Sequence, residues 1–105
     1  MMNKTQFQFQ TYDLFKKYLR IYNEEIKKSR WKINTRFKIV HTWRIVKCTM
    51  KEDCCLHVKV TAMWMMNKIR KFSKEKLEDK EYVNAFVLEG LERGYEYYKA
   101  SQLLR

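Results

Sequence analysis

The chain of 105 residues contains no proline and only two glycines, Gly90 and Gly94. Flexible linkers and glycine-rich phosphate loops are therefore excluded, and we expect a single domain over residues 1–105. Long apolar runs are also missing, because the longest covers only residues 62–66, far too few to span a bilayer. The polar N-terminal segment lacks an apolar stretch, so we expect no secretory signal.

Cysteine is scarce, and its three residues are Cys48, Cys54 and Cys55. An odd number leaves one thiol outside any single disulfide, which favours a reducing, cytoplasmic location over a secreted one. Cys48, Cys55 and His57 could share one face and bind zinc, with Cys54 nearby. The set has no Cys-x-x-Cys spacing, and adjacent cysteines fit a tetrahedral site poorly, so free thiols are favoured over a metal site.

Acidic residues are missing from two stretches, residues 30–48 and 59–74, which carry six and five basic residues respectively. The net charge of the chain is +11, yet from residue 75 onward seven acids outnumber five bases. Such an uneven distribution is typical of proteins that bind nucleic acid, whereas the alternative is a basic protein that is merely soluble.

Apolar and polar residues alternate over residues 36–48 and again over residues 56–66. A period of two predicts a pair of half-buried antiparallel strands joined near residues 51–54. Cations such as Arg44 and Lys59 would lie on the outer face of this long hairpin. At its base Val40, Met63 and Met65 would form an apolar patch that another element or subunit covers.

Helical spacing of apolar residues predicts one helix over residues 12–28 and a second over residues 74–100. Thr11 and Ser73 are the expected N-caps. A short strand is expected around Phe7 and Phe9, and another around Trp31. The predicted order is (β)-α-(β)-β-β-α, an α+β domain with an antiparallel sheet.

The glycines Gly90 and Gly94 share the apolar face of the last predicted helix. We expect them to permit close approach of a neighbouring element or to mark a break in the helix. Together with the apolar patch, this stripe is compatible with a homodimer.

Phosphate binding needs long cationic side chains on an accessible surface, and two segments provide them. One is the outer face of the predicted ribbon with its flanks, and the other is the connector before the last helix. Among the aromatic residues, Trp31 is the best candidate for stacking on bases, since Trp43 and Trp64 fall on the apolar face. The predicted nucleic-acid-binding residues are Arg30, Lys32, Arg36, Lys38, Arg44, Lys59, Lys68, Arg70, Lys71 and Lys74.

The sequence therefore predicts a small DNA- or RNA-binding protein, and small size with high charge suits a regulator of viral or mobile-element type. No nucleotide-binding or catalytic metal motif is present, so we expect no enzyme, no cofactor and no small-molecule substrate. The main alternative is a protein-interaction module or inhibitor that docks a basic ribbon onto an acidic protein. Binding to an anionic membrane surface is a third alternative, although no membrane partner is expected.

Overall fold

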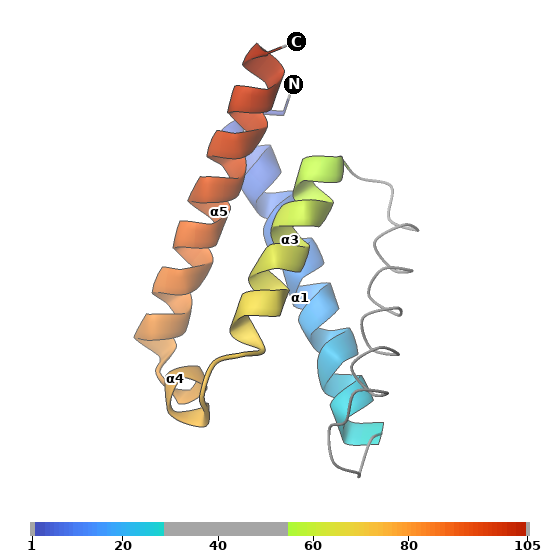
Figure 1. Cartoon of the computed structure of the whole chain (residues 1–105), viewed down its shortest axis with the longest axis vertical. Helices are drawn as coiled ribbons and strands as arrows, with labels where there is room; N and C mark the ends of the chain where they lie inside the picture. Colours follow the sequence, from blue (N-terminus) through green and yellow to red (C-terminus); the bar gives the residue numbers. More distant parts are fainter. Residues whose placement is uncertain (1, 29–54, 105) are drawn as a thin grey trace.

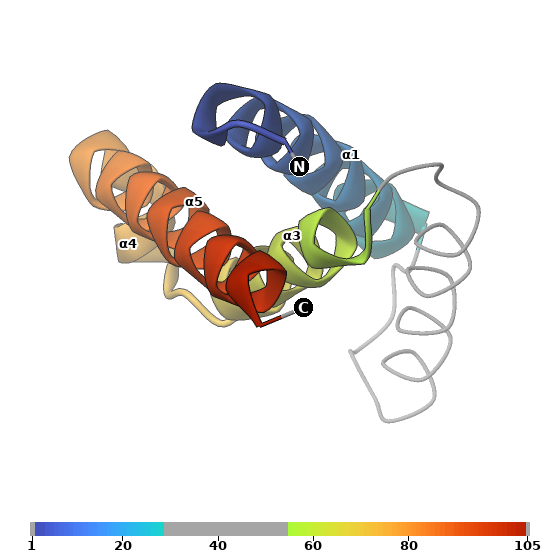
Figure 2. The same cartoon turned by 90° about the horizontal axis from the view of Figure 1, so that it is seen from above.

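The computed structural model describes residues 2–28 and 55–104, and every regular element in those residues is a helix. Helix α1 covers Lys4–Lys28, α3 covers Leu56–Ile69, α4 covers Lys74–Glu78 and α5 covers Lys80–Leu103. Helices α1 and α3 run in the same direction and α5 runs back (Figure 1). Each of these long helices packs against the other two, and Figure 2 shows this three-helix arrangement from above.

The segment predicted to form the second strand of the hairpin is helix α3, so an α+β fold with an antiparallel sheet is wrong for the part of the chain that the structure describes. The buried residues of α3 recur at steps of three and one, which is the pattern of one helix face. They are Val58, Thr61, Ala62, Met65, Met66 and Ile69. The predicted first strand and turn, residues 36–48 and 51–54, and the short strand around Trp31 lie outside the described residues.

Helix α1 begins well before the predicted cap. The Asn3 side chain accepts a hydrogen bond from the Gln6 amide at 2.8 Å, and the Gln6 side chain accepts one from the Asn3 amide at 3.2 Å. This reciprocal pair is a capping box, which satisfies two amides that have no partner within the helix. The predicted cap Thr11 is buried inside α1, and the strand predicted around Phe7 and Phe9 is helical.

Aromatic side chains from α1 and α5 meet the methionines of α3 in the core. Phe7 stacks on Tyr98 with ring centroids 5.2 Å apart, and the Tyr98 hydroxyl accepts a hydrogen bond from the Met2 amide at 2.8 Å. At the same end of the bundle, His57 Nε2 lies 3.1 Å from Ser101 Oγ. These contacts join the start of α1, the start of α3 and the end of α5.

The long last helix predicted from residue 74 is divided into two helices. Ser73 caps α4 as predicted, since its hydroxyl accepts from the Lys76 amide, but α4 ends at Glu78. Asp79 then caps α5, its carboxylate accepting from the Tyr82 amide at 3.1 Å. Because aspartate is a favoured N-cap residue, a second helix can begin at this position.

The expectation that Gly90 and Gly94 permit close approach is confirmed, because both are buried against α3. A Cβ built on Gly90 would lie 2.8 Å from Met65 Cγ, and one built on Gly94 would lie 2.3 Å from Thr61 Cγ2. Helix α5 continues through both positions. The glycines therefore set the spacing of α3 and α5 within one chain.

Candidate nucleic-acid interface

Four of the predicted binding residues lie in and around the turn from α3 to α4. Lys68 is in the last turn of α3, Arg70 is its C-cap, Lys71 follows, and Lys74 is the first residue of α4. The three lysines are exposed and Arg70 is half-buried. Their charges therefore face water within a short stretch that contains no acid before Glu75.

The turn that carries these cations is held against the body of the protein by Phe72. Its ring meets the rings of Tyr82 and Phe86 edge to face, at centroid distances of 5.3 and 5.0 Å. The amides of Lys71 and Phe72 donate to the last carbonyls of α3 at 3.1 and 3.0 Å. Such contacts fix the backbone from which the lysines project, so less ordering is needed when they bind an anion.

The N-terminus of α4 adds little to phosphate binding at this site. Helix α4 has only five residues, and Ser73 already accepts from one of its free amides. A helix this short has little dipole to attract an anion. The site is therefore made of side-chain cations.

Lys59 lies near the start of α3, away from this group at the other end of the helix. It is part of a helix and not of a β-ribbon. Lys68 lies nine positions after Lys59, which corresponds to about 13 Å along the helix axis and about half a turn around it. Lys59 is half-buried beside Val60 and Trp64. The remaining predicted binding residues, Arg30, Lys32, Arg36, Lys38 and Arg44, lie outside the described residues.

A second basic group, which was not predicted as a site, lies on α1. Lys16, Lys17 and Arg20 line a shallow hollow with Asp13, so three cations surround one carboxylate. Their spacing of three and four residues places them on one helix face. The spacing is visible in the sequence, but on a helix predicted from its apolar residues such a polar face is ordinarily just the solvated side.

The basic group on α1 lies near the middle of that helix, and the other basic group lies at the end of α3. Because α1 and α3 run in parallel, the second half of α1 and the turn after α3 both point to the lower end of the view in Figure 1. Lys76, which sits over the rings of Phe72 and Tyr82, adds another cation at this end. This end of the bundle therefore carries the cations of the turn after α3 and Lys76, and the exposed acids Glu75, Glu78, Asp79 and Glu81 lie in α4 and the start of α5 beside them.

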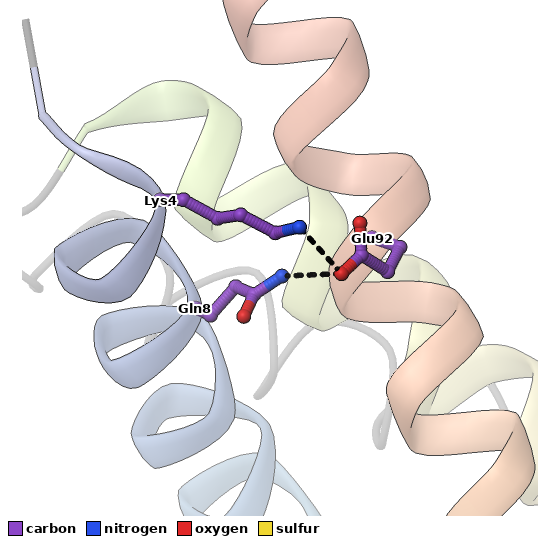
Figure 3. A network of polar contacts seen from close by, with 3 residues as sticks. All are labelled: Lys4, Gln8 and Glu92. Carbon is purple, nitrogen blue, oxygen red and sulfur yellow. Dashed lines mark hydrogen bonds and ion pairs between the residues drawn. The ribbon is translucent and has the colours of Figure 1, made fainter.

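Toward the other end of the bundle, α1 and α5 are joined by an ion pair. The Lys4 ammonium lies 2.8 Å from Glu92 Oε1, and Gln8 donates to the same oxygen at 3.4 Å (Figure 3). The hydrogen bond from Lys4 lowers the pKa of the Glu92 carboxyl, and the same bond raises the pKa of Lys4. Here positive charge is neutralised by a carboxylate of the neighbouring helix.

The two described members of the suggested zinc cluster, Cys55 and His57, lie at the start of α3. Cys55 is a half-buried free thiol, and His57 is bonded to Ser101. Cys48 and Cys54 lie outside the described residues. Within residues 2–28 and 55–104, no three His, Cys, Asp or Glu side chains come together to hold a metal ion.

No family model, curated protein or solved structure matches this chain. Among the described helices, none combines the length and the apolar character needed to cross a membrane.

Proposed function

We propose that this protein binds nucleic acid, DNA or RNA, through cations at one end of a helical bundle. The observation that carries the proposal is the exposed, acid-free turn after α3, with Lys68, Lys71 and Lys74 fixed by the packing of Phe72. The proposal replaces the β-ribbon expected from the sequence with helical elements.

The binding would depend mainly on the release of counterions from phosphates. Each lysine or arginine that neutralises a phosphate releases condensed cations, so affinity falls linearly with salt on logarithmic axes. Phosphate contacts carry little sequence information, and therefore sequence specificity would be modest. The basic face of α1, with Lys16 and Arg20, would extend the contact along the polymer. An intracellular location is part of the proposal.

The direct test is fluorescence anisotropy with random duplex DNA, single-stranded DNA and duplex RNA over a series of salt concentrations. We expect dissociation constants of roughly 1–100 µM near physiological salt, tightening steeply at lower salt. Absence of binding to all three polymers at low salt would reject the proposal. A protein partner with a defined stoichiometry would then become the better explanation of the charge.

A further inference from the structure

A hollow of about 260 Å³ lies between α3 and α5, away from the basic turn. Its walls include Val60 and Trp64 from α3 and Arg93 and Tyr97 from α5, and Gly94 lies between them. Trp64 is 36% exposed and Tyr97 is 74% exposed, so two large rings border the same opening while remaining in contact with water. The sequence had assigned Trp64 to the core.

Two glycines of α5 are part of the lining of the hollow. Gly90 and Gly94 let the backbone of α5 approach Met65 and Thr61 closely, so the large side chains that border the hollow are Trp64 on α3 and Arg93 and Tyr97 on α5. Trp64 is held on one side by Phe86, with ring centroids 6.2 Å apart and planes 26° from parallel. One wall of the hollow is therefore a positioned aromatic ring.

The chemistry of the lining favours a flat aromatic group that belongs to an anion. Indole, phenol and guanidinium groups all stack on nucleobases, and a hollow of this size admits one base. Arg93 pairs with Glu89 at 2.8 Å, but a guanidinium has five N–H donors and keeps several for a phosphate. On the other side of Val60 and Trp64, Lys59 borders a second shallow hollow.

We propose that this groove takes an unpaired base of a single-stranded nucleic acid, stacked between Trp64 and Tyr97, with Lys59 and Arg93 at the neighbouring phosphates. The inference rests on the proposed function and adds single-strand recognition to it. Charge complementarity favours this occupant over a second copy of the chain, since a second copy would bring another net charge of +11.

The test compares a short oligothymidine with an abasic oligomer of the same length and phosphate number. Wild-type protein should bind the oligothymidine roughly tenfold more tightly, because stacking adds to the same phosphate contacts. The Tyr97→Ser variant should reduce this ratio toward one while leaving the affinity for the abasic oligomer unchanged. Phe9→Ser is the matched control, since Phe9 is 72% exposed on α1 and lies outside the groove.

Trp64→Leu should also lower the ratio, and circular dichroism would establish that this variant remains folded. A wild-type ratio of one, or a ratio that Tyr97→Ser leaves unchanged, would overturn the base site while binding of the abasic oligomer still supported the proposed function. Absence of binding to both oligomers would overturn this inference, whereas the proposed function would be rejected only if duplex DNA and duplex RNA also failed to bind at low salt. Dimerisation in sedimentation experiments that Tyr97→Ser abolishes would assign the groove to a second copy and overturn the proposal.

Discussion

Gly94 of α5 packs directly against Thr61 of α3, so that a Cβ on the glycine would lie 2.3 Å from Thr61 Cγ2 and 2.6 Å from Thr61 Oγ1. No side chain fits at this crossing unless one of the helices moves. The contact therefore fixes how closely α3 and α5 approach, and with it the shape of the groove between Trp64 and Tyr97.

Gly94→Ala should destabilise the protein although alanine favours helix by about 1 kcal/mol over glycine. Overpacking at a rigid crossing costs about 1–3 kcal/mol, and the nearest atoms belong to the short, branched Thr61 side chain. Urea denaturation would measure the change in unfolding free energy. Gly90→Ala is the matched comparison and should cost less, because its Cβ would lie 2.8 Å from Met65 Cγ instead of 2.3 Å from Thr61 Cγ2, and the unbranched Met65 side chain can adjust more easily than Thr61. Equal effects of the two substitutions would contradict this account.

A double-mutant cycle would locate the clash at Thr61. If the Thr61 side chain is the obstacle, Thr61→Ala should recover part of the stability that Gly94→Ala removes. Additive losses would show instead that the glycine is needed for another reason.

Asn3→Ala should lower stability by about 1 kcal/mol, because the capping box of α1 loses the acceptor for the Gln6 amide. Thermal unfolding followed by circular dichroism would measure it. Thr5→Ala is a suitable control, since Thr5 is exposed in the same turn and is not part of the cap. An effect of Thr5→Ala as large as that of Asn3→Ala would show that the turn as a whole, and not the cap, is responsible.

Thr11→Val should stabilise the protein by about 1 kcal/mol. The Thr11 hydroxyl is buried in α1 without a hydrogen-bond partner, and an unpaired buried hydroxyl costs about 1–3 kcal/mol. Valine keeps the shape of threonine and removes that polar group. Chemical denaturation with Thr5→Val as the exposed control would test it, and a loss of stability would show that the hydroxyl has a partner in solution.

The ion pair between Lys4 and Glu92 should make stability depend on acid pH. The pKa of Glu92 is lowered from its ordinary value of 4.5, so this contribution is present above that value and is lost as the pH falls through the lower folded-state pKa. For Lys4, whose pKa is raised above 10.5, the contribution disappears only in strong alkali. Glu92→Gln should slightly lower the melting temperature at neutral pH and show no difference from wild type in strong acid. Both side chains are about half exposed, so high salt should shrink the effect.

The wrong prediction of a strand over residues 56–66 has a physical origin in the composition of α3. Most positions from Leu56 to Ile69 are apolar or β-branched, so periods of two and of 3.6 both fit the sequence. The alternation of Leu56, Val58 and Val60 predicts that all three face the core of a strand, yet Leu56 and Val60 are exposed and Val58 is buried. The steps from Val58 to Thr61 and Ala62, repeated at Met65 and Met66, were equally visible and proved correct.

Single residues with a known structural role predicted the structure more reliably than the alternation of apolar and polar residues over residues 56–66. The cap at Ser73 and the close approach at Gly90 and Gly94 followed from single residues with one dominant role. Asn3 and Gln6 carried a similar cap signal that was overlooked. The end of α4 at Asp79 was harder to predict, because the residues around it are compatible with a continuous helix.

The basic turn after α3 was found from charge alone, whereas the groove could not be. Lys68, Lys71 and Lys74 are neighbours in sequence, so no fold was needed to group them. Trp64 and Tyr97 come from different helices, and only the packing of Gly94 on Thr61 places them at one opening. Contacts between distant segments depend on helix directions that periodicity does not determine.

Nucleic-acid binding at the turn after α3 is best tested by measuring its salt dependence after removal of single charges. If Lys71 contacts a phosphate, Lys71→Gln should weaken binding about equally for all sequences and reduce the slope of the logarithmic salt plot by about one. Lys99→Gln removes the same charge from an exposed site near the other end of α5 and should leave the slope unchanged. Equal slopes for wild type, Lys71→Gln and Lys99→Gln would contradict binding at this turn.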